Sequence, residues 1–464
     1  MKKLINIEII GLVLILICAC RNNQLKLNGK SLVKDLLIQN TMNNDSLRND
    51  STSTTNNKNQ ETLINGRKII DLKRWLEEPT PDELSWLKHN IYPLKTYDPN
   101  SISEEDLKIL KKLIGNSRVV ALGETTHGSS EIFKMKHRII KYLMENDGFD
   151  IFSIEANMPE SYKLNEYLIE GKGNPIDLIK GMYFWTWRTQ EILDMVEWMR
   201  KYNKSDDKIH FTGFDMQFYF GAIQELSEAF KINSVIQDEI TELKTTLDEF
   251  NNERKNNPQA VISQENKKKI DNQLNRLRDY ISKSEYPVFK KSWLSQNIRI
   301  VEESLDIASR DKYMADNLLW IKSQNPDSKI ITWAHNYHIK KTGNSMGRYL
   351  SDSLKNNYFT IGFTFNKGIY TAVGDKGLTS YQAQESYLGT YEYVFNAIKE
   401  PIFLLDLREA KKQNLISNKW LLGQLSFRSV GAKKINTEFY DTDLTADFDL
   451  IIFISESTNS KLLE

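Results

Sequence analysis

Short apolar runs alternate with longer helical patterns from Ile69 to the end of the sequence. Most of the runs are rich in Val, Ile and Phe and are apolar throughout, which is typical of strands buried on both faces. Such alternation indicates βα units. We predict an α/β fold with a largely parallel central sheet flanked by helices and with strands at Arg118–Leu122, Asp150–Ile154, Lys208–Thr212, Lys329–Ala334, Tyr358–Thr364, Pro401–Leu405 and Asp449–Ile454.

The first residues have the pattern of an export signal. Lys2 and Lys3 precede an apolar run, Ile9–Ala19, that has the length of a signal-peptide core and is short for a membrane span. The run ends in Ile-Cys-Ala-Cys, which resembles a bacterial lipobox, so we predict a lipoprotein signal peptide over residues 1–19 and lipidation of Cys20. The protein would then be exported and lipid-anchored to a bacterial membrane, facing the periplasm or the cell surface. An ordinary signal peptide and an uncleaved anchor are the alternatives.

Two further regions differ from the alternating pattern. Residues 20–66 are poor in aromatic residues and rich in Asn, Ser, Thr and Lys, which predicts a disordered tether before a folded domain at 67–464. Residues from about 222 to 310 contain charged helical patterns and no strand signal, which predicts a helical insertion. The charges of the insertion suit a solvated face, and the alternative is a lid over a pocket.

Charge and cysteine content exclude several classes of function. Lys plus Arg and Asp plus Glu are both 62, so no net charge recruits nucleic acid, and we expect no nucleic-acid partner. The only cysteines, Cys18 and Cys20, precede the folded domain, which excludes a cysteine nucleophile and a Cys-ligated zinc site there. Hydrolytic chemistry would then depend on His, Asp, Glu, Ser or a metal held without thiolates.

Titratable side chains follow four of the predicted strands. Glu124 and His127 lie in a glycine-bounded turn, Gly123–Gly128, between the first strand and a helical pattern that starts near Ser130. The next strands end at Glu155, at Asp215 and at His335. Ligands of open α/β sheets bind beyond the carboxyl ends of parallel strands, so we expect these groups to share one edge of the sheet. Two His and two Glu together indicate a general acid–base site or a divalent metal site.

Two further patterns each allow two interpretations. Lys136 lies in the middle of the apolar arc of the helix after Ser130, where its ammonium either reaches the surface or pairs with Glu124 or Glu155. Ser345 lies in a G-x-S-x-G match, but no strand runs directly into it. We therefore interpret Ser345 as a helix N-cap rather than as a nucleophile.

The motifs together resemble the erythromycin esterase family. The resemblance extends from about residue 107 to 453 and rests on Gly123-Glu124-Thr125-Thr126-His127-Gly128, Glu131, Lys136-His137-Arg138, Ile154-Glu155-Ala156, Trp198–Asn203, Gly213-Phe214-Asp215, Arg310–Ala315, Trp333–His338 and Met346-Gly347.

The resemblance implies a metal-independent hydrolase that opens a macrolide lactone, or another bulky ester, with an activated water, and thus a role in macrolide resistance. It implies His127 as the general base, Glu124 and Glu155 as essential carboxylates and His335 as a second histidine. Lys136 stands where some members have a catalytic Arg, although Lys lacks the planar fork of Arg. Trp187 either lines an apolar cleft for the substrate or packs in the core. Candidates for binding a developing oxyanion are Lys136, Arg188 and the backbone N–H groups near Ser129 and Ser130, and we assign Arg188, His338 and Asp215 to substrate binding.

Two other functions use the same residues. A metal-dependent hydrolase would coordinate a divalent ion through Glu124, His127, Glu155 and His335. A surface lipoprotein that binds haem or another small ligand would use His335 or His127 as the axial group.

Overall fold

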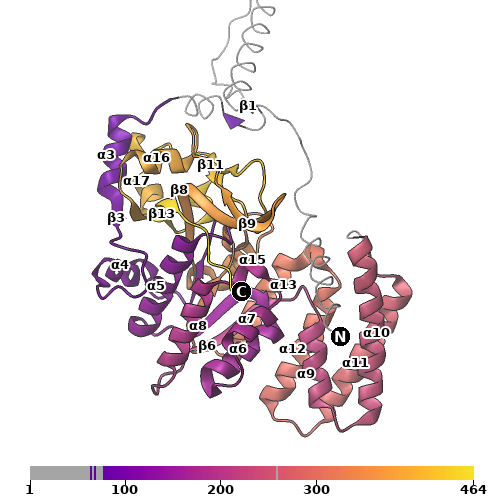
Figure 1. Cartoon of the computed structure of the whole chain (residues 1–464). Helices are drawn as coiled ribbons and strands as arrows, with labels where there is room; N and C mark the ends of the chain where they lie inside the picture. Colours follow the sequence, from indigo (N-terminus) through magenta and orange to yellow (C-terminus); the bar gives the residue numbers. More distant parts are fainter. Residues whose placement is uncertain (1–62, 65–66, 69–76, 258–259) are drawn as a thin grey trace, which may run out of the picture. The chain divides into compact units, whose positions relative to one another are not determined.

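The computed structural model describes residues 63–64, 67–68, 77–257 and 260–464. The described chain divides into two compact units (Figure 1). One, the insertion unit, contains the described residues of Gln217–Ala308; the other, the sheet unit, contains the described residues of Lys58–Met216 together with Ser309–Glu464. Cys20, the predicted signal peptide and most of the predicted tether lie outside the described residues. Near the end of that tether, Leu63–Ile64 forms strand β1, which pairs antiparallel with β2, Arg67–Lys68.

The sheet unit is built on a nine-stranded mixed sheet with the order β3-β10-β13-β8-β4-β7-β5-β6, in which β9 pairs with β8. The six strands from β13 to β6 are parallel, whereas β10 is antiparallel to both its neighbours. The predicted α/β fold with a largely parallel sheet is thus confirmed. The bounds are β3 Ile91–Pro93, β4 Val119–Leu122, β5 Ile151–Asn157, β6 His210–Asp215, β7 Ile330–Trp333, β8 Tyr358–Gly374, β9 Gly377–Gln382, β10 Ile402–Asp406 and β13 Leu450–Ser457.

Each predicted strand overlaps an observed one, but the prediction for β8 stops ten residues short. The prediction ended at Thr364, whereas β8 continues to Gly374 and turns back into β9. After Asn366 the strand passes through the exposed Lys367 and the partly exposed Ile369 before Tyr370–Ala372 are buried again, so the continuous apolar run that marks a buried strand ends there. Strands β3, β9, β11 (Leu425–Arg428) and β12 (Phe439–Thr442) were not predicted, because they are short or have exposed positions.

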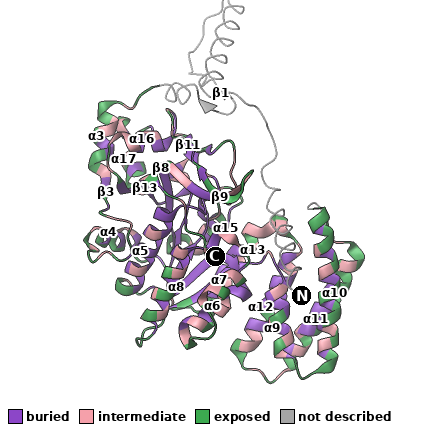
Figure 2. Cartoon of the chain, in the orientation of Figure 1, coloured by how far each residue is buried: buried purple, intermediate pink, exposed green. Residues whose placement is uncertain are grey.

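Helices of the sheet unit flank the sheet. Helix α5 packs against β8 and β13, and α13 packs against β6. Figure 2 shows the strands mostly buried and the outer helical faces exposed. The helices are α3 Pro81–Asn90, α4 Lys108–Ile114, α5 Ser130–Asn146, α6 Met158–Glu170, α7 Pro175–Gly181, α8 Gln190–Tyr202, α13 Arg310–Gln324, α14 Asn336–Ile339, α15 Met346–Leu354, α16 Tyr391–Ala397, α17 Leu407–Gln413 and α18 Leu444–Asp447, with 3-10 turns at Glu105–Leu107, Trp185–Trp187, Lys355–Asn357 and Ile416–Asn418.

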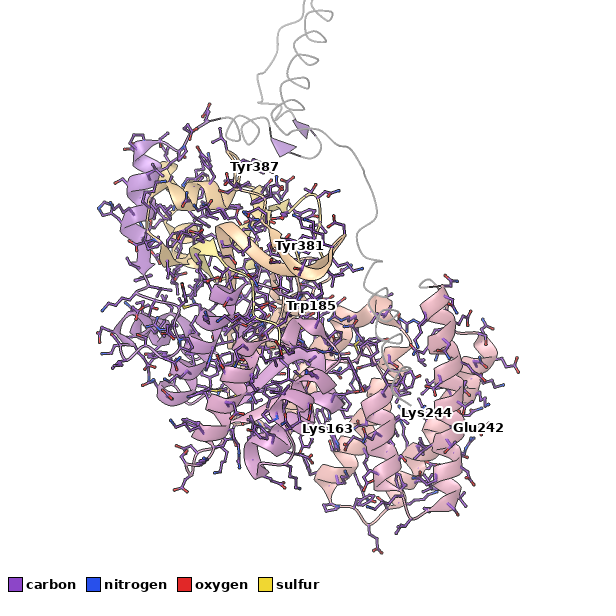
Figure 3. All side chains as sticks on the ribbon, viewed as in Figure 1. Lys163, Trp185, Glu242, Lys244, Tyr381 and Tyr387 are labelled. Atoms are coloured by element: carbon purple, nitrogen blue, oxygen red, sulfur yellow. The ribbon has the colours of Figure 1, made fainter. Side chains whose placement is uncertain are left out.

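The insertion unit contains helices α9 Phe220–Ala229, α10 Ser234–Asn256, α11 Gln264–Lys283 and α12 Val288–Ser304. Its described residues include no strand. Ion pairs lie on the surface of α10 and α11: Lys244 pairs with Asp248 one turn further along α10, and Glu242 of α10 pairs with Lys269 of α11 (Figure 3). Exposed pairs of this kind contribute little to stability, so the buried apolar stripes of the helices hold the unit together. The role of the insertion as a lid stays a prediction.

No helix among the described residues is long and apolar enough to cross a membrane.

Candidate active site

The turn between β4 and α5 is packed so tightly that two of its positions require glycine. A Cβ atom at Gly123 would lie 2.0 Å from the Asn336 side-chain oxygen, and one at Gly128 would lie 1.9 Å from the Thr371 carbonyl oxygen. Real Cβ atoms do not approach other atoms so closely. The two glycines therefore let the turn that carries Glu124 and His127 lie directly against its neighbours.

Glu124 is fully buried and accepts hydrogen bonds from three side chains. One oxygen accepts from His127 Nδ1 at 2.7 Å, and the other accepts from Lys136 Nζ at 2.6 Å and from Trp333 Nε1. Lys136 thus forms the ion pair with Glu124 and does not reach the surface. The ammonium also lies 3.9 Å from the centre of the Trp333 ring. Burial lowers the pKa of Lys136 to about 7, although Glu124 opposes this change.

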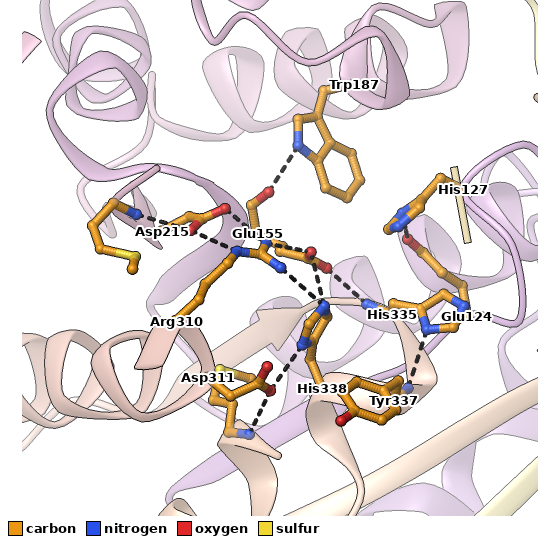
Figure 4. A network of polar contacts seen from close by, with 12 residues as sticks. Glu124, His127, Glu155, Trp187, Asp215, Arg310, Asp311, His335, Tyr337 and His338 are labelled. Carbon is orange, nitrogen blue, oxygen red and sulfur yellow. Dashed lines mark hydrogen bonds and ion pairs between the residues drawn. The ribbon is translucent and has the colours of Figure 1, made fainter. Parts of the chain in front are cut away.

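His127 is oriented by Glu124. Because a carboxylate only accepts hydrogen bonds, Nδ1 of the imidazole must carry the proton that it donates to Glu124. In the neutral ring, Nε2 then has the lone pair and is the atom that can accept a proton. The ring is 5.3 Å from that of His335 and 5.8 Å, edge to face, from that of Trp187. The two imidazoles expected to converge at the sheet edge are therefore neighbours (Figure 4).

His335 uses both of its ring nitrogens in hydrogen bonds. As the N-cap of α14, its Nδ1 accepts from the Tyr337 amide at 3.1 Å, and its Nε2 donates to the Thr125 carbonyl oxygen at 3.2 Å. Burial, together with His127 and His338, lowers the pKa of His335 to about 3, so the ring stays neutral near pH 7. In this arrangement the ring has no lone pair to offer to a metal, to haem iron or to a proton. His335 therefore positions its neighbours, and its amide donates to Glu155 at 3.0 Å.

Arg310 joins two carboxylates that come from different strands. Its guanidinium contacts Glu155 of β5 at 2.7 Å and both oxygens of Asp215 of β6 at 2.8 and 3.0 Å. Burial raises the pKa of Glu155, but His338 and Arg310 outweigh it and hold that pKa below its usual range. Asp215, assigned to substrate binding from the sequence, has both oxygens bound by Arg310.

His338 occupies the more open end of this network, with 13% of its side chain exposed. Its Nδ1 donates to Asp311 at 2.8 Å, and its Nε2 lies 3.2 Å from Arg310 Nη1 and 3.3 Å from Glu155. Burial lowers the pKa of His338, but Asp311 and Glu155 outweigh that effect and raise it above its usual value. The raised pKa favours protonation of His338 beside Glu155, and the nearby Arg310 guanidinium opposes it (Figure 4).

Sequence reasoning assigned no role to Arg310 or Asp311. Both stand in one of the quoted motifs, at the start of a helical pattern. A charged pair at a helix start is so common on protein surfaces that nothing local marked it as buried. Only the contacts with Glu155, Asp215 and His338 identify the two residues as part of the site.

Trp187 contacts a residue of the site, Glu155, whereas the Arg188 side chain hydrogen-bonds to Tyr183. Trp187 is buried, and its Nε1 donates to the main-chain oxygen of Glu155 at 3.0 Å. The Arg188 guanidinium instead donates to the Tyr183 carbonyl oxygen at 2.9 Å. Of the predicted oxyanion donors, Lys136 is committed to Glu124, and the Ser130 amide donates to the Thr458 carbonyl oxygen.

The structure also bears on the metal site and on the serine nucleophile that were considered from the sequence. Within the described residues, no three His, Cys, Asp or Glu side chains are arranged to hold a metal ion. Ser345 is the N-cap of α15, where its hydroxyl accepts from the Arg348 amide and donates to the Lys340 carbonyl oxygen. The N-cap interpretation is confirmed.

Two solved structures share the fold. A succinoglycan biosynthesis protein is 30% identical and aligns over 82% of this chain and 98% of its own, with a TM-score of 0.71. A variant of an erythromycin esterase in its open conformation is 19% identical and aligns over 79% of this chain and 98% of its own, with a TM-score of 0.62. The second likeness concerns the fold alone.

Two curated relatives are similar in sequence. A putative hydrolase of Bacillus subtilis, YbfO, is 27% identical over 71% of this chain and 82% of its own length. An erythromycin esterase type II of Escherichia coli is 26% identical over 66% of this chain and 84% of its own length.

The model of the erythromycin esterase family matches residues 144–457. This range includes Glu155, Arg310, His335 and His338, whereas Glu124, His127 and Lys136 lie before it. It covers more than half of the chain, so the resemblance seen in the motifs is confirmed. The chain belongs to the erythromycin esterase family of hydrolases.

Proposed function

We propose that this protein hydrolyses a bulky ester, such as a macrolide lactone, with a water molecule activated by His127. The observation that carries the proposal is the hydrogen bond from His127 Nδ1 to the buried Glu124, because it leaves Nε2 as the proton acceptor. A general base of this kind contributes roughly 10²–10⁴-fold to a reaction rate.

The proposed first step forms one bond and moves one proton. His127 Nε2 takes a proton from water while the water oxygen attacks the ester carbonyl carbon, and the carbonyl oxygen becomes an oxyanion. Glu124 stabilises the resulting imidazolium, as the carboxylate of a catalytic triad does. Lys136 and Trp333 hold Glu124 in place for this role.

The second step expels the alcohol, which must receive a proton. We assign the role of general acid to His338, because it is partly exposed and because Asp311 and Glu155 favour its protonated form. An imidazolium there stabilises the oxyanion and can protonate the departing alkoxide. Glu155, held by Arg310, keeps His338 oriented toward the reacting atoms.

The substrate is proposed on family grounds and on the surface beside His338. Tyr337, an exposed aromatic residue, has its ring edge to face with that of His338 at 5.4 Å. An exposed ring next to the proposed acid suits contact with a large, mostly apolar alcohol portion. The name of the erythromycin esterase relative supports a macrolide, whereas the other relatives carry different names.

The test is a screen of the purified protein against several macrolides and simpler esters, followed by mass spectrometry for the gain of one water. We expect H127A to lower kcat about 10²–10⁴-fold. The same substitution at the exposed His89, H89A, is the matched control and should leave kcat unchanged. Full turnover by a folded H127A protein would exclude His127 as the base.

Two further measurements separate the alternative functions. Stoichiometric metal in the purified protein, with activity lost on chelation, would favour a metal-dependent hydrolase. A Soret band on haem titration, with no ester hydrolysed, would favour a ligand-binding lipoprotein. Neither result is expected to involve His335, because both of its ring nitrogens are in hydrogen bonds.

A further inference from the structure

The chain that follows β13 crosses the turn that carries His127. We call Ser457–Leu463 the crossing segment; in Figure 1 it is the yellow trace that leads from β13 toward the end marked C. The Ser130 amide donates to the Thr458 carbonyl oxygen at 3.0 Å, and the Ser460 amide donates to the Gly128 carbonyl oxygen at 2.8 Å. The crossing segment therefore pairs, like a short antiparallel strand, with the residues that directly follow His127.

The same segment then pairs with the residues that follow Trp187. The Gln190 amide donates to the Lys461 carbonyl oxygen at 2.7 Å, and the Leu463 amide donates to the Arg188 carbonyl oxygen at 2.8 Å. An antiparallel bridge joins Thr189 and Leu462. One stretch of seven residues thus connects the His127 turn with the Trp187 turn, which are about 60 positions apart in the sequence.

Two buried carboxylates outside the catalytic network hold the crossing segment. Glu131, in the first turn of α5, accepts from the amide of Thr458 at 2.5 Å and from its hydroxyl at 2.6 Å. Glu191, in the first turn of α8, accepts from the Lys461 amide at 3.2 Å and from the Ser130 hydroxyl at 2.5 Å. Both carboxylates lie in the first turn of a helix, where the helix dipole favours acidic side chains.

We propose that Glu131 and Glu191 are positioning residues that act through the crossing segment. By anchoring it to the starts of α5 and α8, they set the separation of the His127 and Trp187 rings, which is 5.8 Å. Trp187 in turn donates a hydrogen bond to the main-chain oxygen of Glu155, so this separation also sets the position of His127 relative to Glu155. The inference rests on the proposed function, because it assigns a catalytic purpose to that geometry.

The sharpest test uses one position with two substitutions. S460P removes the amide that donates to Gly128, whereas S460A keeps it and removes only a hydroxyl that has no hydrogen-bond partner. We expect S460P to lower kcat about 10- to 100-fold, with a much smaller change in KM, because small displacements of catalytic groups cost rate. S460A should match the wild type. Equal kcat in S460P and S460A would overturn the proposal.

A second pair of variants separates positioning from simple loss of stability. E131A removes both acceptors for Thr458, whereas E131Q keeps one amide oxygen as an acceptor. We expect E131Q to have a kcat closer to that of the wild type than E131A has, when both are assayed well below their Tm. Equal losses of kcat in the two variants, or a loss that only follows the unfolded fraction, would contradict the proposal.

Hydrogen exchange tests the crossing segment without any substrate. In the wild type the Ser130 and Gln190 amides should exchange slowly, and in S460P both should exchange faster, because both donate to carbonyl oxygens of the crossing segment. Faster exchange confined to one of the two turns, or in neither, would overturn the inference. If the wild type hydrolyses no ester but exchange rises in both turns, the proposed function fails and the coupling of the turns stands.

Discussion

Three donors surround the buried Glu124 side chain, namely the His127 ring, the Lys136 amine and the Trp333 indole. Removing one partner of a buried pair leaves the other charge uncompensated. The ion pair therefore matters more for keeping Glu124 in place than for net stability.

We predict that K136A destabilises the protein by about 3–5 kcal/mol at pH values below the Lys136 pKa of about 7, since it leaves the buried Glu124 without its ammonium partner. Urea denaturation followed by circular dichroism measures this change. K134A, on the same helix but at a partly exposed position, is the control and should change stability by less than about 1 kcal/mol. Equal stability of the two variants would mean that Glu124 does not need the ammonium.

Asp311 sets the protonation of His338 in the proposed mechanism. The folded-state pKa of His338 is raised, so the stabilisation that its imidazolium adds is complete below the unfolded value near 6.5 and is lost as the pH rises through the folded-state pKa. We predict that D311N lowers this pKa and moves the alkaline limb of the kcat/KM profile to lower pH. D316N, on the same helix, is the control. A profile of D311N identical to that of D316N would exclude this role.

At the scale of elements, the contact between α5 and α8 includes a histidine that must stay neutral. His137 is buried beside the Trp198 ring, and its Nε2 has no hydrogen-bond partner. Burial lowers its pKa to about 3. In the unfolded chain the same ring takes up a proton near pH 6.5, so stability falls as the pH decreases from about 6.5 toward 3.

We therefore predict that H137Q makes the stability less sensitive to acid than in the wild type. Urea midpoints at pH 7 and pH 4.5 measure this difference. H89Q makes the same exchange at an exposed histidine of α3 and should retain the full acid sensitivity of the wild type. If H137Q and H89Q lose the same stability between the two pH values, His137 is not a source of the acid sensitivity.

Elements buried on both faces were predictable from local sequence, and partly exposed elements were not. Strand β4 is apolar throughout and was predicted to within one residue. In β9 most positions are exposed, and the strand forms because it pairs with β8 rather than because it is apolar. Pairing between segments is a tertiary interaction, so hydrophobic periodicity does not reveal it.

At the scale of the whole molecule, the predicted lipid at Cys20 would determine where the hydrolase works. We predict that the full chain, produced in a bacterial host, is found in membranes with a lipid on Cys20, and that C20A lacks the lipid. C18A is the matched control and should keep it. Membrane fractionation with mass spectrometry of the amino-terminal peptide decides the matter, and a lipid retained by C20A would exclude Cys20 as the acceptor.

The kinds of chemical group at the site were evident before folding, because strand ends, glycine turns and catalytic residue types are local patterns. The sequence also predicted that four side chains would lie close together, since the carboxyl ends of parallel strands share one edge of a sheet. These are Glu124, His127, Glu155 and His335. The sequence did not predict which side chains would hydrogen-bond to one another. Arg310 binding Glu155 and Asp215, and the occupied nitrogens of His335, depend on side-chain packing between segments far apart in the chain. Burial and hydrogen-bond geometry, which exist only in the folded protein, made those choices.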